Sequence, residues 1–187
     1  MFGEVYDSET GLPVNALEYN PWRYWFRVSV GAAVTAGQVI QYFNTQPATG
    51  TRTTNMPSPG AQFPQSWTVY VLGMAIRPAA GTTPADLILM YDNFYVQIMV
   101  GQNKIWTQGL MHDFGSGGGM SGQTTLNASS IVTNGTPNAA SIEPFPVPLK
   151  LSHGLTFEIQ IICPTATTLS VARNIDVVLP CWQRIPA

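Results

Sequence analysis

Residues 22–30 read Trp-Arg-Tyr-Trp-Phe-Arg-Val-Ser-Val, and large apolar side chains recur there at every second position. One parity is apolar throughout: Trp22, Tyr24, Phe26, Val28 and Val30. The other parity mixes charge with one indole: Arg23, Trp25, Arg27 and Ser29. Period two is typical of a β-strand with one face against a core. The stretch therefore predicts a strand that packs through one face and offers tryptophan and arginine on the other.

The same alternation extends to other parts of the chain. Phe157, Ile159 and Ile161 alternate with polar residues, and so do the apolar residues of 174–179. Segments 67–77 and 94–100 are apolar on both parities, as expected of strands covered on both sides. Further strands are expected at 34–43, 104–110 and 147–151. The chain is therefore predicted to be all-β, with about eight strands.

A single helix is predicted to begin at Thr83, whose hydroxyl can cap it. Pro84 suits the first helical position, and Asp86 lies near the positive end of the helix dipole. The apolar residues that follow end at Asp92-Asn93. Residues 100–104 then predict a tight hairpin turn between two strands.

The remaining segments are expected to form an N-terminal arm, 1–21, and two long loops, 44–66 and 112–144. The first loop is rich in proline and the second in glycine, serine, threonine and asparagine. A loop as long as the second is uncommon unless it is functional, ordered by a partner or mobile. No repeat and no linker divides the chain, so residues 1–187 are read as one domain.

Composition limits the classes of function. Of the 187 residues, 45% are hydrophobic and only 10% are charged, with a formal net charge of −2. Ordinary soluble domains carry about 25% charged residues. These values exclude a disordered chain and a charge-rich coiled coil, and they argue against a basic surface for nucleic acid. A surface so poor in charge is expected to be covered by other proteins.

The two cysteines, Cys163 and Cys181, are too few for a disulfide framework or a four-ligand zinc site. We expect two free buried thiols, with one bridge between neighbouring strands as the alternative. Residues 1–11 lack the features of a secretory signal, and no apolar run approaches the roughly 20 residues of a membrane-spanning helix. The chain is therefore expected to be made in a host cytoplasm and not exported individually.

No pattern in the sequence predicts catalysis. The glycine-rich match at 117–122 is not followed by a helix, as a dinucleotide site would require. His112 stands beside Asp113 in a loop, and His153 lies in a turn. Neither histidine has a nucleophile motif or a metal-ligand spacing. We expect no enzyme activity, no cofactor or metal site, and no small-molecule substrate.

Contacts between subunits are expected where tryptophan, phenylalanine and arginine gather, because Trp and Arg are enriched in protein interfaces. Stacking of sugars or nucleic-acid bases is the alternative for the aromatic residues at 22–26, although single-strand binding normally needs a positive groove. The predicted interface residues are Trp22, Arg23, Trp25, Arg27, Phe63, Phe114, Trp182 and Arg184.

From residue 67 onward the order of features resembles a known family. Its components are the strand Trp67-Thr-Val-Tyr-Val-Leu-Gly-Met-Ala-Ile-Arg, the helix at 85–90 leading into 94–104, and the segments 148–161 and 171–184. Together they resemble the small single-jelly-roll capsid proteins of tailless icosahedral viruses, in particular membrane-containing phages and archaeal viruses. The resemblance implies a single jelly-roll antiparallel β-sandwich and carries over no site residue.

What this resemblance implies is a structural virion protein that assembles into trimers or larger capsomers and then into an icosahedral shell. Its partners would be copies of itself and other capsid proteins. Because residues 1–21 are acidic, a viral membrane or another protein layer is expected beneath the shell in place of nucleic acid. The alternatives are a carbohydrate- or receptor-binding jelly roll and, more remotely, a cupin-like enzyme.

Overall fold

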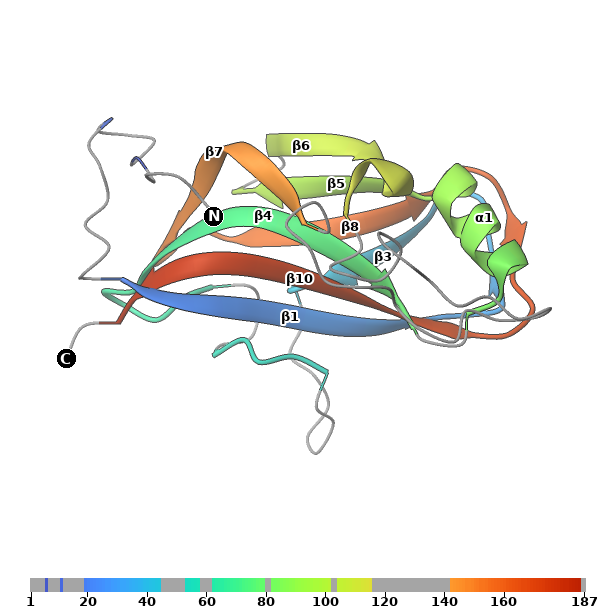
Figure 1. Ribbon diagram of the computed structural model, residues 1–187, viewed down its shortest axis with the longest axis horizontal. Coiled ribbons are helices and arrows are strands. Elements are labelled where there is room, and N and C mark those ends of the chain that lie inside the picture. Colours follow the sequence, from blue (N-terminus) through green and yellow to red (C-terminus); the bar gives the residue numbers. More distant parts are fainter. Residues whose placement is uncertain are drawn as a thin grey trace.

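The alternation at residues 22–30 forms strand β1 (Asn20–Val30) in the computed structural model, where Tyr24, Phe26 and Val30 are buried. The structure describes residues 6, 11, 19–44, 53–57, 62–79, 82–101, 104–115 and 142–185. Much of the predicted N-terminal arm and of both predicted long loops, the glycine-rich match at 117–122 included, lies outside these residues. The described part is built mainly from antiparallel strands in two layers (Figure 1).

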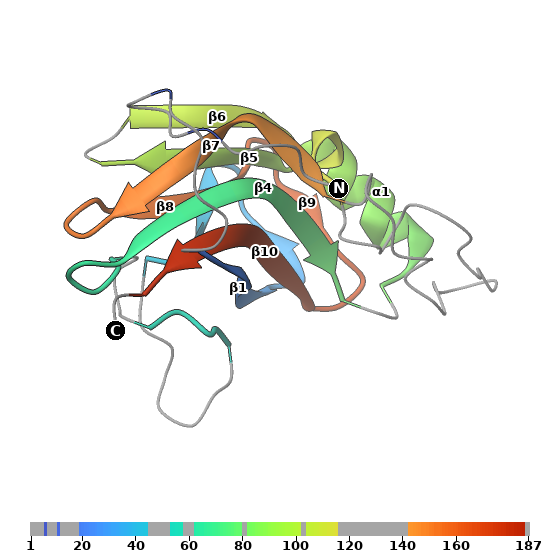
Figure 2. The same ribbon diagram turned by 60° about the vertical axis from the view of Figure 1, so that its left-hand side comes forward.

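Two four-stranded sheets form these layers. Sheet I has the order β1, β10 (Arg173–Arg184), β4 (Thr68–Pro78) and β7 (Glu143–Ser152). Sheet II has the order β3 (Gln38–Tyr42), β8 (Phe157–Cys163), β5 (Tyr95–Val100) and β6 (Lys104–Leu110). Figure 2 shows both layers from a second side. A short pair, β2 (Ala33–Val34) with β9 (Thr167–Thr168), joins them at one end.

The order of pairing defines the fold. Among the eight long strands, the first pairs with the last, the second with the seventh, the third with the sixth and the fourth with the fifth: β1 with β10, β3 with β8, β4 with β7, and β5 with β6. Every one of these pairs is antiparallel. This is the winding of a single jelly roll, and it confirms the predicted fold class.

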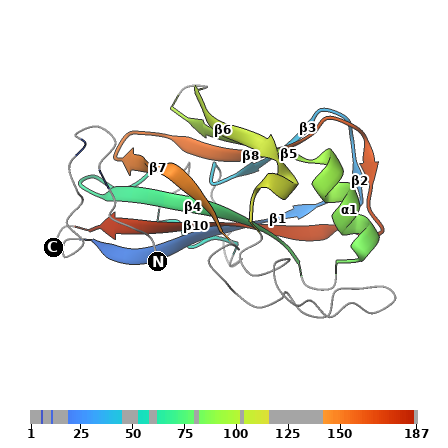
Figure 3. The same cartoon turned by 45° about the horizontal axis from the view of Figure 1, so that its top comes forward.

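The predicted helix is confirmed as α1 (Pro84–Asn93), which closes one end of the sandwich beside the short helix η2 (Met111–Asp113) (Figure 3). The Thr83 hydroxyl accepts a hydrogen bond from the Asp86 backbone N–H at 3.2 Å. The Asp86 carboxylate is buried and accepts bonds from the Ser170 backbone N–H at 2.8 Å and from the Arg173 Nη2 at 2.8 Å. These contacts attach α1 to the segment that leads into β10.

The core lies between the sheets and is rich in aromatic rings. Phe63 stacks on Phe157 with ring centroids 6.0 Å apart, and Phe43 lies 5.5 Å from Phe157. Phe114 also belongs to this core. The predicted subunit contacts at Phe63 and Phe114 are therefore wrong, because both rings pack inside the subunit and leave only 2% and 7% of their surface exposed.

Several predicted boundaries change. The strand expected at 34–43 is divided into β2 and β3, because the chain turns at Gly37 with φ +78°. The strand expected at 147–151 begins earlier, at Glu143, so the loop predicted at 112–144 is shorter. Strand β5 is covered on one face only; Gln97 and Met99 are half-buried on the other. The strand at 104–110 is confirmed.

Candidate functional site

Strand β1 forms one edge of sheet I, and residues 53–57 protect part of that edge (Figure 1). The Arg27 backbone N–H donates to the Thr53 carbonyl oxygen at 2.7 Å. The Thr54 hydroxyl donates to the Trp25 carbonyl oxygen at 2.7 Å. An exposed edge is a template for pairing with another strand, so this segment occupies the groups that such a strand would use.

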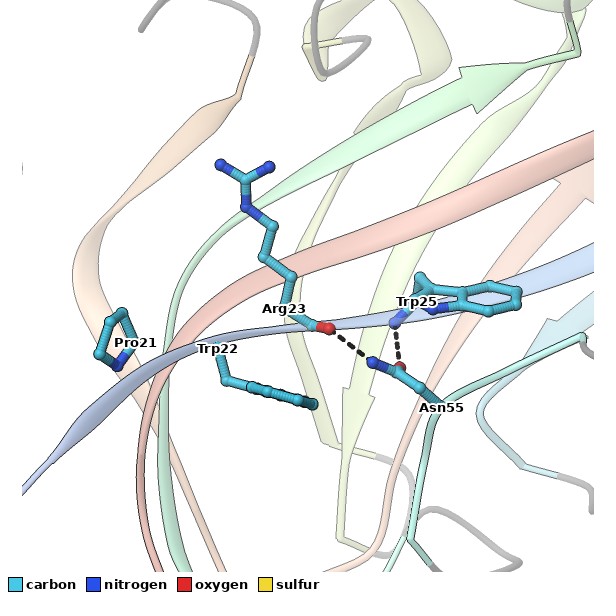
Figure 4. Close-up of a pocket in the computed structure, with 5 residues that line it drawn as sticks. All are labelled: Pro21, Trp22, Arg23, Trp25 and Asn55. Carbon is cyan, nitrogen blue, oxygen red and sulfur yellow. Dashed lines mark hydrogen bonds between the residues drawn. The ribbon is translucent and has the colours of Figure 1, made fainter.

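The side chain of Asn55 continues the protection by imitating a peptide group. Its Oδ1 accepts from the Trp25 backbone N–H at 2.8 Å, and its Nδ2 donates to the Arg23 carbonyl oxygen at 2.8 Å (Figure 4). Because one amide satisfies a donor and an acceptor of β1, no further strand is needed there. Beyond Arg23, the next outward position is Pro21, which has no N–H to donate.

A pocket opens at the end of this protected stretch. It has a volume of about 420 Å³ and is lined by Pro21, Trp22, Arg23, Trp25 and Asn55 (Figure 4). We call it the tryptophan pocket. Trp22 and Trp25 have opposite parity on β1, so the pocket is wrapped around the edge of the strand. Trp22 is 48% exposed although it shares the parity of the core residues, because it lies at the outer end of the strand.

Six of the eight predicted interface residues lie together on the adjacent strands β1 and β10. Register places Arg23 opposite Pro180, Arg27 opposite Asp176, and Pro21 opposite Trp182. Trp22 faces the other way, as described above. The remaining five residues share the outer face of sheet I: Arg23, Trp25, Arg27, Trp182 and Arg184.

This outer face carries a surplus of arginine. Arg27 forms a two-bond pair with Asp176, at 2.6 and 2.7 Å, and Arg77 lies on the other side of the same aspartate in register. Burial lowers the pKa of the Arg77 guanidinium, and repulsion from Arg23 lowers it further, while Asp176 acts in the opposite direction. Within the described part of the chain, Arg23 has no acidic partner.

The opposite edge of sheet I is protected in a different way. Strand β7 contains Glu143-Pro-Phe-Pro-Val-Pro148, which we call the proline segment. Phe145 is buried and lies 4.7 Å from the ring of Trp106. The residues on either side are exposed, and Val147 leaves 52% of its surface open. Proline lacks the N–H that ladder pairing requires, so this edge is closed to an added strand.

The outer face of sheet II is almost uncharged. Register aligns an amide row across all four strands: Gln41, Gln160, Gln97 and Gln108. The neighbouring row is apolar: Val39, Ile162, Tyr95 and Leu110. Gln97 Nε2 donates to Gln160 Oε1 at 2.5 Å. The next row adds one charge, Glu158, whose carboxylate accepts from Asn44 Nδ2 at 2.7 Å.

The residues considered for chemistry are used in local contacts. His112 Nδ1 lies 3.3 Å from the Tyr91 carbonyl oxygen, and His153 Nδ1 lies 3.1 Å from that of Phe63. In the described ranges, no three His, Cys, Asp or Glu side chains gather closely enough to hold a metal ion. Cys163 and Cys181 are free and buried, as predicted, and burial raises the pKa of Cys181 to about 12.

Sequence reasoning identified the strands of the site and missed several of its members. Asn55 and Arg77 were not expected there, because only the folded chain brings 53–57 to β1 and β4 to β10. Pro21 stands next to Trp22 in the sequence, but it was assigned to the N-terminal arm, 1–21. The glutamine row could have been found by aligning strand partners, but no single strand displays it. Among the described helices, none is long and apolar enough to cross a membrane.

Comparisons with protein-family models, with curated proteins and with solved structures found no match to this chain. The jelly-roll sandwich is therefore defined by its own strand pairing. The resemblance to capsid proteins stays a prediction from the sequence.

Proposed function

We propose that this chain is a structural virion protein, a capsid subunit that assembles with copies of itself into capsomers and an icosahedral shell. In this proposal its partners are other copies and other capsid proteins, and it is made in the host cytoplasm and carried in the virion. A jelly roll alone does not define a function, since many functions use the same fold. The proposal therefore depends on the molecular surface.

The observation that carries the proposal is the almost uncharged outer face of sheet II. Val39, Ile105 and Leu110 remain 45%, 47% and 39% exposed there, beside a row of amides that runs across all four strands. The side chains on the solvent-facing side of an antiparallel sheet are normally polar or charged. Depletion of charge with exposed apolar side chains is typical of the centre of a protein interface. Such a face supports permanent association.

The oligomeric state of the purified chain tests the proposal. We expect size-exclusion chromatography with light scattering to give oligomers at micromolar concentration, and electron microscopy to show capsomers or closed particles. Leu110→Lys places a charge in the apolar row and should dissociate them. Ile88→Lys is the matched control, because Ile88 is an exposed apolar residue that lies on α1 and belongs to neither sheet. A wild-type chain that stays monomeric would contradict the proposal.

A carbohydrate- or receptor-binding module is the second candidate, favoured by the exposed indole of Trp22 in the tryptophan pocket. An open indole face can stack on a sugar ring. A glycan array tests this function directly. Binding that is lost in Trp22→Ala and kept in Ile88→Ala would favour it over the shell-forming function, whereas an array without hits would remove it.

A further inference from the structure

The lining of the tryptophan pocket limits what it can bind. Two indoles and the ring of Pro21 supply mostly apolar surface. The Asn55 amide already bonds to the backbone of β1 through both its oxygen and its nitrogen. The Arg23 side chain points away from Trp22, toward the outer face of sheet I (Figure 4), and has no acidic partner among the described residues. The pocket therefore suits a segment with apolar rings, few hydrogen-bonding groups and a nearby carboxylate.

The proline segment of β7 has these properties. Pro144 and Pro146 are exposed and have no N–H, and Val147 is exposed between two prolines. Glu143 stands at the start of the segment, and in the described chain no salt bridge engages it. Aromatic grooves bind proline-rich segments because the proline rings pack on indole faces and the backbone is already extended. The buried Phe145 holds the segment in place, which lowers the entropy lost on binding.

We propose that the tryptophan pocket of one subunit binds the proline segment, Glu143–Pro148, of a second copy, with Glu143 near Arg23. This inference rests on the proposed function, because it names the contact that would join subunits within a capsomer. The occupant is a second copy and not a free saccharide, because a sugar needs partners for its hydroxyl groups. The pocket offers few polar groups that are not already bonded within β1.

The topology gives the contact its direction. β1 and β7 are opposite edges of sheet I, so the pocket and its occupant cannot be the same patch on both subunits. With each edge bound to a different neighbouring copy, the interface is head-to-tail, and repetition generates a ring or an open chain. A ring of copies leaves the outer face of sheet II available for other contacts.

Cysteine cross-linking tests the pairing without removing the pocket. Asn20→Cys lies one residue before the pocket lining, and Val147→Cys lies within the proline segment. Both native thiols are buried, so a short bis-maleimide reagent should react only with the added cysteines. We expect cross-linked dimers when the two variants are mixed and none from either variant alone. Ile88→Cys, at the far end of the sandwich, should not cross-link with either (Figure 1).

Charge exchange provides a second readout. Arg23→Glu and Glu143→Arg should each raise the concentration for half-association at least about tenfold. The chain that carries both changes should associate again, because the two charges are exchanged within each contact. Trp22→Ala should weaken association as strongly, and Ile88→Ala should not. Failure of the double variant to regain association, with each single variant folded by circular dichroism, would overturn the pairing.

The outcomes separate this inference from the proposed function. If particles form but the mixture of Asn20→Cys and Val147→Cys gives no cross-linked dimer, the proposed pairing is overturned and the proposed function stands. Cross-links from Asn20→Cys alone overturn it in favour of a two-fold contact between β1 edges. Loss of glycan binding in Trp22→Ala overturns it in favour of a saccharide site. A monomeric wild-type chain overturns both.

Discussion

Both edges of sheet I could pair with a strand of another chain, and they are protected from this by different chemistry. On β1, the side chain of Asn55 and the segment around Thr54 bond to backbone groups that another strand would use. On β7, prolines remove the donors altogether. The β1 edge is protected by hydrogen bonds, which can break and form again. The β7 edge is protected by the covalent structure of proline, whose backbone nitrogen carries no hydrogen. As a result, neither of these protected stretches can simply accept an added strand.

The difference also decides what each edge can still do. The protection of β1 ends at Arg23, and a pocket with two indoles opens there. The protection of β7 leaves proline rings and Val147 exposed. One edge therefore offers a concave aromatic site and the other a rigid apolar segment. Substitutions at four sites separate loss of the fold from loss of either edge.

The largest effect is expected from Asp86→Ala, which disturbs neither edge and so measures a global loss. It removes a buried carboxylate that accepts two hydrogen bonds from the Arg173 guanidinium, so we expect a loss of about 3 kcal/mol in the free energy of unfolding. Urea denaturation measures it. Burial acts to raise the pKa of Asp86, but hydrogen bonds from Ser170, Arg173 and Thr83 outweigh it and hold the pKa at about 2.

The same carboxylate gives a pH dependence of known sign. Because the folded pKa is below the unfolded value of about 4, the stabilisation is present above that value and is lost as the pH falls toward 2. The difference in stability between wild type and Asp86→Asn should therefore shrink across this window. A stability difference that stays constant between about pH 5 and about pH 2 would contradict the role given to the carboxylate.

Gly73→Ala should break the β7 edge. A Cβ at Gly73 would lie 2.4 Å from the Glu143 carbonyl oxygen, in the irregular part of the β4–β7 pairing. Either β4 or β7 must move, and we expect the free energy of unfolding to fall by roughly 1–3 kcal/mol. Gly31→Ala is the control, since its nearest neighbour would be 3.6 Å away. Hydrogen exchange should show the loss of protection concentrated in β7; uniform loss would argue against a local effect.

Asn55→Ala should break the β1 edge at a smaller loss of stability. It leaves the Trp25 N–H and the Arg23 carbonyl oxygen without their side-chain partner, which is expected to reduce stability by about 1 kcal/mol. Because the exposed edge can then pair with other chains, aggregation on storage should increase. Thr53→Ala keeps the carbonyl group that bonds Arg27 and should behave as wild type. Equal aggregation of both variants would show that Asn55 does not protect the edge.

The smallest effect is expected from Arg27→Ala, which removes the exposed pair with Asp176 between the protected edge and the next strand. Cross-strand pairs of this kind contribute about 0.2–1 kcal/mol, and salt screens them. Unfolding measured at low and high salt should show the difference from wild type only at low salt. A larger, salt-independent loss would mean that the arginine acts through packing.

Much of the architecture could be predicted because burial leaves a periodic record. Phe157, Ile159 and Ile161 alternate with polar residues since β8 has one buried face, and the capping residues of α1 stand in sequence order. The errors have a common origin. Phe63 and Phe114 lie in segments without periodicity, so nothing local distinguishes an interface ring from a core ring. The break at Gly37 has a positive φ, which a glycine in the sequence permits but does not require.

The sequence by itself determined most of the strands, the buried faces of β1 and β8, the helix and the scarcity of charge, because each depends on neighbours a few residues away. The tertiary structure decided which strands pair, and through them the glutamine row of sheet II, the approach of Asn55 to β1, and the placing of pocket and proline segment on opposite edges. These features join residues far apart in the chain. Their contacts depend on long-range register, and no local pattern carries that information.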